Sequence, residues 1–120
     1  MSNILLVDDN LNNMYLFHYI LERQGYVVTE AYNGQEAVDK ALADNFDLVL
    51  MDIQMPVKDG ITATREILQK KPDQLIVAVS ARVMQTDLAL VEEVGFAGFI
   101  EKPIEPQNFA ALVKKYLSDV

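Results

Sequence analysis

Short apolar runs alternate five times with longer amphipathic segments, and this alternation constrains the fold of the 120-residue chain most strongly. The runs are rich in Val, Ile and Leu at successive positions, which is typical of strands covered on both faces. They span 4–7, 26–29, 48–51, 75–79 and 97–100. The amphipathic segments predict helices over about 11–24, 34–44, 61–71, 85–94 and 106–118. Five strand–helix units predict one α/β domain over 1–120, with a parallel sheet and helices on both faces.

The composition narrows the function classes. The chain has no Cys, which excludes a disulfide scaffold, a thiolate zinc site and a Cys nucleophile. Its 18 acidic and 10 basic residues give a net charge of −8. This charge argues against direct nucleic-acid binding, because phosphate contacts need clustered Lys and Arg. We see no signal-peptide pattern and no run of about 20 apolar residues, so we expect a cytoplasmic protein without membrane association.

Polar side chains follow four of the five predicted strands. Asp8 and Asp9 follow the first strand, Asp52 the third, Ser80 the fourth and Lys102 the fifth. Ligands of open parallel sheets bind outside the carboxyl ends of the strands, near the point where the strand order reverses. If the order is 2-1-3-4-5, the first and third strands are central neighbours, and the three carboxylates converge.

Three converging carboxylates have a chemical consequence. They repel one another, so either one has a raised pKa or a cation neutralises them. Oxygen ligands without His or Cys favour Mg²⁺. A carboxylate can attack phosphorus and form an acyl phosphate, while Mg²⁺ and a Lys stabilise charge on the transferring group. These residues therefore suit phosphoryl transfer onto an Asp.

Five motifs at the ends of the predicted strands resemble those of the receiver domains of bacterial two-component signalling. They are Val7-Asp8-Asp9-Asn10, LVLMDIQMP over 48–56, Asp59-Gly60, Val79-Ser80-Ala81 and GFIEKP over 98–103. The resemblance covers essentially the whole chain. It implies a flavodoxin-like (βα)5 sandwich with a five-stranded parallel sheet of order 2-1-3-4-5. It also implies that the domain accepts a phosphoryl group from a phosphohistidine of a histidine kinase or phosphotransfer protein, and then switches a protein-interaction surface.

The resemblance implies a role for each polar residue of the site. Asp52 is the phosphoacceptor, Ser80 contacts the phosphoryl group, and Lys102 pairs with Asp52 or its phosphate. The implied Mg²⁺ ligands are Asp8, Asp9, Asp52 and the backbone carbonyl of Gln54. On this interpretation the domain is no enzyme toward other substrates, because it catalyses only its own phosphorylation and slow dephosphorylation.

Four further residues have implied switching or tuning roles. Phe99 occupies the family's aromatic switch position, and Pro103 follows the site lysine. Gln54 and Arg82 flank the phosphoryl group and tune its lifetime. Phe99 has no phenolic hydroxyl, so its switching would depend on packing.

The first predicted helix carries a candidate docking surface. On a helical wheel Leu11, Met14 and Tyr15 lie with His18 on the outward side, and we expect His18 to be exposed. The inward side is expected to hold Leu16, Phe17, Ile20 and Leu21. Because the outward side is more apolar than a solvated face requires, we expect it to contact the helices of the phosphohistidine partner.

Other interpretations share some of these features. A haloacid-dehalogenase-type Mg²⁺ phosphohydrolase also uses an Asp nucleophile after a strand, but it usually has a second acid where this chain has Gln54. A non-phosphorylated flavodoxin-like interaction module would share the fold and leave the acidic site unexplained. Asp8, Asp9 or Asn10 could also serve only as helix N-caps.

Overall fold

The computed structural model describes residues 2–80, 85–102 and 105–118. Strands and helices alternate through this part of the chain, as the apolar pattern predicts. They are β1 (Asn3–Val7), α1 (Leu11–Arg23), β2 (Val27–Ala31), α2 (Gly34–Ala43), β3 (Leu48–Asp52), α3 (Gly60–Lys70), β4 (Ile76–Ser80), α4 (Gln85–Val94), β5 (Gly98–Glu101) and α5 (Pro106–Ser118). None of the helices in the described residues is long and apolar enough to cross a bilayer.

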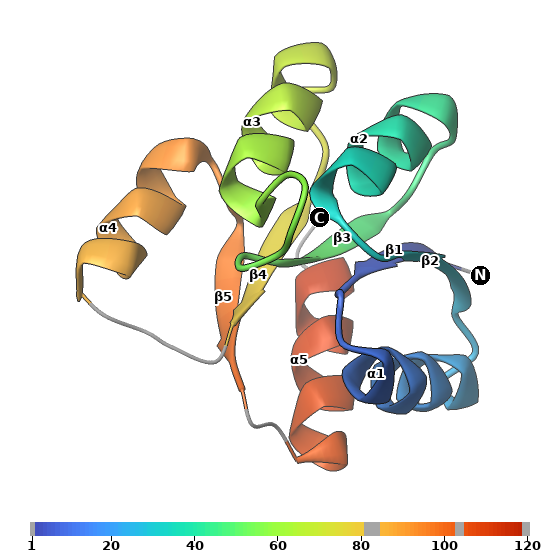
Figure 1. Cartoon of the computed structure of the whole chain (residues 1–120). Coiled ribbons are helices and arrows are strands. Elements are labelled where there is room, and N and C mark those ends of the chain that lie inside the picture. Colours follow the sequence, from blue (N-terminus) through green and yellow to red (C-terminus); the bar gives the residue numbers. More distant parts are fainter. Residues whose placement is uncertain (1, 81–84, 103–104, 119–120) are drawn as a thin grey trace.

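The strands form one parallel sheet in the order β2-β1-β3-β4-β5, which confirms the predicted order. The central strand β1 pairs with both β2 and β3, so that Val7 lies beside Ala31 on one side and Met51 on the other. Helices α1 and α5 cover one face of the sheet, and α2, α3 and α4 cover the other (Figure 1). The molecule is therefore a three-layer sandwich with β1 and β3 at its centre.

The central strands contribute alternate side chains to two apolar layers. Ile4 of β1 belongs to the layer under α1 and α5, whereas Leu5 belongs to the layer under α2, α3 and α4. In the first layer Phe17 of α1 stacks on Phe109 of α5 with ring centroids 4.7 Å apart. This double covering explains why the central strands are apolar at successive positions. The edge strand β2 differs from the prediction, because only part of it is covered and Val27 is 47% exposed.

The carboxyl ends of four strands, β2 to β5, lie one or two residues beyond the apolar runs that predict them. Asp52 and Ser80 are the last residues of β3 and β4, because the ladder continues through the pairs Asp52–Val79 and Ser80–Glu101. Two polar residues of the predicted site therefore lie on the sheet itself. A strand backbone paired to its neighbours holds a side chain more rigidly than a loop does.

Side-chain caps fix where three of the helices begin. The side-chain oxygens of Asn10, Asn33 and Asp59 accept hydrogen bonds from backbone N–H groups in the first turns of α1, α2 and α3. The capping box expected at α2 is only partly present. Glu36 N–H donates to Asn33, but the Glu36 carboxylate accepts from the Asn33 side-chain amide and not from its backbone N–H.

The orientation of α1 corrects part of the helical-wheel prediction. Met14 is 2% exposed and packs in the core layer with Phe17 and Leu21, three and seven residues further along the helix. Leu16 is instead 41% exposed. The assignment of Met14 to the outward docking side is therefore wrong, since residues at this spacing share the buried face of a helix.

Candidate phosphoacceptor and metal site

The three acidic side chains converge at the carboxyl ends of β1 and β3, as the sequence predicts. Each of Asp8, Asp9 and Asp52 offers a carboxylate oxygen, and these oxygens all lie within 4.8 Å of one another. Asp8 is 2% exposed and Asp52 is 6% exposed, whereas Asp9 is exposed. Two buried acids therefore share one small site with an acid that solvent reaches.

The turn after β1 leaves these acids free of helix capping. Asn10, and neither of the acids before it, is the N-cap of α1 and accepts from Asn13 N–H at 3.0 Å. Asp8 Oδ1 accepts from Asn10 N–H at 2.9 Å, which fixes the turn that leads into the helix. The capping interpretation of Asp8 and Asp9 is therefore wrong. Asn10 caps α1, and the two acids face the site.

Lys102, directly after β5, places its ammonium group beside the acids. Its Nζ lies 2.8 Å from Asp8 Oδ2 and 3.6 Å from Asp52 Oδ2, and its side chain is 12% exposed. The backbone also ties the strand ends together, because Lys102 N–H donates to Ser80 carbonyl oxygen at 2.7 Å. Ser80 is 4% exposed at the end of β4. The fold therefore brings the side chains of the three acids and Lys102 together, and Ser80 is joined to Lys102 through its backbone carbonyl.

The electrostatics of the site favour a divalent cation. Burial is the main reason why the pKa of Asp52 rises from its ordinary 3.8 to about 6, against the opposing effect of Lys102. The charges of Asp8 and Asp9 raise this pKa further, whereas a hydrogen bond from Gln54 N–H lowers it. Three carboxylates and one ammonium group leave a charge of −2 when all are ionised. An all-oxygen donor set with this charge fits a hard divalent cation.

The remaining predicted site residues lie around this centre. Gln54 N–H donates to Asp52 Oδ1 at 3.3 Å, so the chain turns back over the acceptor directly after β3. Phe99 on β5 is half-buried and packs against the core layer under α2, α3 and α4. Arg82 and Pro103 lie outside the described residues. The switching and tuning roles of these four residues stay predictions.

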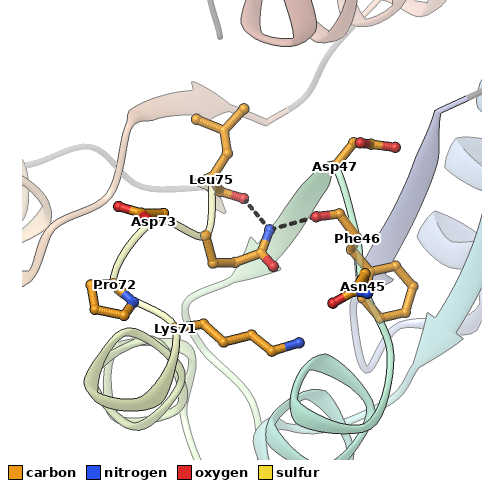
Figure 2. A pocket seen from close by; sticks show the side chains of 8 residues that line it. Asn45, Phe46, Asp47, Lys71, Pro72, Asp73 and Leu75 are labelled. Carbon is orange, nitrogen blue, oxygen red and sulfur yellow. Dashed lines mark hydrogen bonds between the residues drawn. The ribbon is translucent and has the colours of Figure 1, made fainter.

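The pocket shown in Figure 2 lies at the opposite end of the sheet from the acids. Its lining comes from the segments that precede β3 and β4. Gln74 Nε2 donates to the carbonyl oxygens of Phe46 and Leu75, and Lys71 Nζ donates to those of Ala41 and Asp44 at the end of α2. These side chains close the helix end and the strand starts, so we assign the pocket a structural role.

The exposed side of α1 begins directly beside the acidic site. Leu11 is 71% exposed and Tyr15 is 78% exposed, and Tyr19, which is not among the predicted docking residues, is 52% exposed. These three residues are spaced by four, so they form one ridge, which we call the α1 ridge. Their spacing alone would have found Tyr19.

His18 differs from its prediction as an exposed residue. Its side chain is 25% exposed and lies between α1 and β2. Nδ1 is 2.6 Å from Glu30 Oε2 on β2, and Nε2 is 3.1 Å from Glu22 Oε2 on α1. The histidine therefore ties the first helix to the edge strand.

The fold and the acidic site together are typical of a class of proteins that accept a phosphoryl group on an Asp. Comparison with known proteins identifies the family. The family model of the response regulator receiver domain matches residues 4–114. The chain belongs to this family. Receiver domains interact with kinases or phosphotransfer proteins, and membership removes the haloacid-dehalogenase alternative.

Three relatives illustrate the family's range. The chain is 36% identical over 122 residues to the polar-differentiation response regulator DivK of Brucella anthropi, covering 98% of both proteins. It is 37% identical over 116 residues to the transcriptional regulatory protein ResD of Bacillus subtilis, of which it covers 48%. The receiver domain of the sensor histidine kinase PA1611 from Pseudomonas aeruginosa PAO1 is 31% identical, with a TM-score of 0.90 and 98% coverage of both chains. That structure has a magnesium ion coordinated in its active-site cleft.

Proposed function

We propose that Asp52 is the phosphoacceptor of this receiver domain and that its phosphorylation requires Mg²⁺ held at the three acids. The observation that carries the proposal is the convergence of Asp8, Asp9 and Asp52 at the carboxyl ends of β1 and β3, with Lys102 beside them. Magnesium in the cleft of the PA1611 receiver supports the identity of the metal. We assign the ligand role to the three carboxylates and the Gln54 carbonyl.

The proposed reaction transfers one phosphoryl group. A carboxylate oxygen of Asp52 attacks the phosphorus of a phosphohistidine, an O–P bond forms, and the N–P bond breaks. The electron pair of that bond returns to the imidazole, which takes up a proton from solvent. Bound Mg²⁺ supplies positive charge for the phosphoryl oxygens. Lys102 adds a second positive charge from the β5 side, and the Ser80 hydroxyl donates a hydrogen bond to a phosphoryl oxygen.

The catalytic contribution of this chain is largely positioning. Asp52 lies on a paired strand, and the Gln54 N–H bond to Oδ1 fixes the rotation of its carboxylate. An oriented carboxylate reacts with much less loss of entropy than a free one. The site therefore promotes its own phosphorylation and slow hydrolysis, and we propose no turnover of a separate substrate.

Intact-mass measurement tests the acceptor. The protein is incubated with acetyl phosphate or phosphoramidate, with Mg²⁺ or with a chelator. We expect one labile phosphate in the presence of Mg²⁺, its loss in Asp52→Asn, and its retention in Asp73→Asn, which changes an exposed acid far from the site. A folded protein that takes up no phosphate is the result expected of a non-phosphorylated interaction module, and release of many phosphates is that of a hydrolase.

We propose that the α1 ridge docks the helices of the phosphohistidine partner. The ridge is apolar and exposed, and Leu11 follows the N-cap that borders the acids. A partner on this ridge would therefore lie next to Asp52. The cytoplasmic location and the single domain over 1–120 stay predictions.

Substitution of the ridge separates docking from chemistry. We expect Leu11→Glu with Tyr15→Glu to slow transfer from a phosphohistidine protein and to leave labelling by acetyl phosphate unchanged. Asn12→Glu, on an exposed position of the same turn, is the charge control. Equal transfer rates in the ridge variant and the wild type would contradict the docking role.

A further inference from the structure

The N-terminus of α2 contacts the loop that links β3 to α3. Gly34 N–H donates to the carbonyl oxygen of Lys58 at 3.0 Å, although the two residues belong to different elements. A Cβ atom at Gly34 would lie 2.1 Å from this oxygen and 2.7 Å from the carbonyl carbon, closer than folded chains tolerate. Among the described glycines only Gly25 and Gly95 have a positive φ. The missing side chain of Gly34 therefore serves the close approach and no unusual backbone conformation.

The same loop is fixed again where it leaves β3. Gly60 N–H donates to Ile53 carbonyl oxygen at 2.8 Å, and a Cβ atom at Gly60 would lie 2.0 Å from Asp52 carbonyl oxygen. Gln54, whose carbonyl is the proposed fourth metal ligand, lies between this contact and the one at Lys58. The metal-binding part of the loop is thus held from both sides.

The loop needs an external restraint because its backbone is strained. Val57 has a φ of 69°, and it is the one non-glycine residue with positive φ in the described part of the chain. A β-branched side chain in this conformation is an outlier that persists only where neighbouring contacts impose it. Val57 is 83% exposed, so its own side chain supplies little packing. The restraint comes from the next residue, whose carbonyl binds Gly34 and whose ammonium pairs with Glu66.

We propose that Gly34 is a positioning residue for the metal site. Because Gly34 has no side chain, the Lys58 carbonyl can approach the N-terminus of α2, and this contact fixes the strained loop. The fixed loop in turn holds the Gln54 carbonyl where it can bind a cation that is bound to Asp52. The proposal rests on the proposed function, because it assumes that the three acids bind Mg²⁺. It adds α2 to the elements that determine metal affinity, although α2 contributes no metal ligand.

Calorimetric titration of Mg²⁺ into Gly34→Ala tests this role. The added methyl group must displace the Lys58 carbonyl, and we expect Mg²⁺ affinity to fall about 10- to 100-fold, as when groups that orient metal ligands are removed. Gly98→Ala is the matched control, since its methyl group would meet Tyr116 of α5 in place of the loop. It is expected to bind Mg²⁺ like the wild type. Unchanged affinity in folded Gly34→Ala overturns the proposal.

Amide hydrogen exchange of the wild type tests the same coupling without a variant. The first N–H groups of a helix have no helical acceptor, so protection of the Gly34 amide reports its bond to Lys58. If that bond supports Mg²⁺ binding, Mg²⁺ must strengthen the bond by the same factor. We therefore expect slower exchange at Gly34 with saturating Mg²⁺.

The outcomes separate this inference from the proposed function. Exchange at Gly34 that does not respond to bound Mg²⁺ overturns the positioning role alone. A wild-type protein that binds no Mg²⁺ in the titration overturns both the metal site and the positioning role. Global stability of each variant, measured by urea denaturation, shows whether lost affinity reflects unfolding.

Discussion

Replacement of Asp52 by Asn is expected to stabilise the metal-free domain. Burial makes the ionised carboxylate unfavourable in the folded state, which raises its pKa from 3.8 to about 6. One pKa unit corresponds to about 1.4 kcal/mol, so the ionised group destabilises the fold by roughly 3 kcal/mol near neutral pH. Asn has nearly the same shape and can still accept from Gln54 N–H. It removes the charge, while Lys102 keeps its closer partner Asp8.

The pH dependence of this difference has a definite sign. A folded-state pKa above the unfolded value means that the native protein binds more protons. The stabilising effect of this proton is complete below pH 3.8 and is lost as the pH rises through about 6. The advantage of Asp52→Asn over the wild type is therefore expected to be small at low pH, to grow across this interval and to stay constant above it.

Urea denaturation followed by circular dichroism measures the effect. The free energies of unfolding of wild type, Asp52→Asn and the exposed-acid control Asp73→Asn are compared with chelator across that pH range. Mg²⁺ is then added, and it is expected to stabilise the wild type more than Asp52→Asn, because ligands stabilise the state that binds them. Equal stabilities of wild type and Asp52→Asn at every pH would refute the account of a buried, destabilising charge.

Three further substitutions test the fold. Thr64→Val is expected to raise the free energy of unfolding by about 1 kcal/mol, because the buried Thr64 hydroxyl has no hydrogen-bond partner among the described residues. A loss of stability in this variant would show that the hydroxyl is hydrogen-bonded. Phe109→Ala is expected to lower the free energy of unfolding by about 3–5 kcal/mol, because it leaves a cavity in the apolar layer between α5 and the sheet. A loss below about 1 kcal/mol would contradict this packing. Asn10→Ala removes the N-cap of α1 and is expected to lower the free energy of unfolding by about 1 kcal/mol in the same denaturation assay. An unchanged denaturation midpoint would show that the cap does not stabilise the protein.

Much of the fold follows from patterns that are local in the sequence. Buried strands of a parallel sheet are apolar over most of their length, and the three caps mark helix starts, so the element order was predictable and the boundaries were predictable to within two residues. The ends of β3 and β4 were less so. Polar residues such as Asp52 and Ser80 resemble loop residues, and only pairing with a neighbouring strand keeps them in the sheet.

The site was predictable in its members and less so in its surroundings. Strand ends gave the acids and Lys102, because topology alone brings them together. The spacing of Met14 from Phe17 and Leu21 already indicates the buried face of α1, whereas the exposure of Leu16 could not be settled from a helix with apolar residues on more than one side. The contact between Gly34 and Lys58 depends on how two distant elements approach each other, and no sequence pattern encodes that distance.

Chemical trapping of the acyl phosphate tests the central claim most directly. The protein is phosphorylated with acetyl phosphate and Mg²⁺, reduced with borohydride and digested, and its peptides are sequenced by mass spectrometry. Reduction converts a phosphoaspartate into homoserine, so we expect homoserine at position 52 and unmodified Asp8 and Asp9. Homoserine at another aspartate, or no homoserine in a protein that carries phosphate, would contradict the assignment of Asp52 as phosphoacceptor.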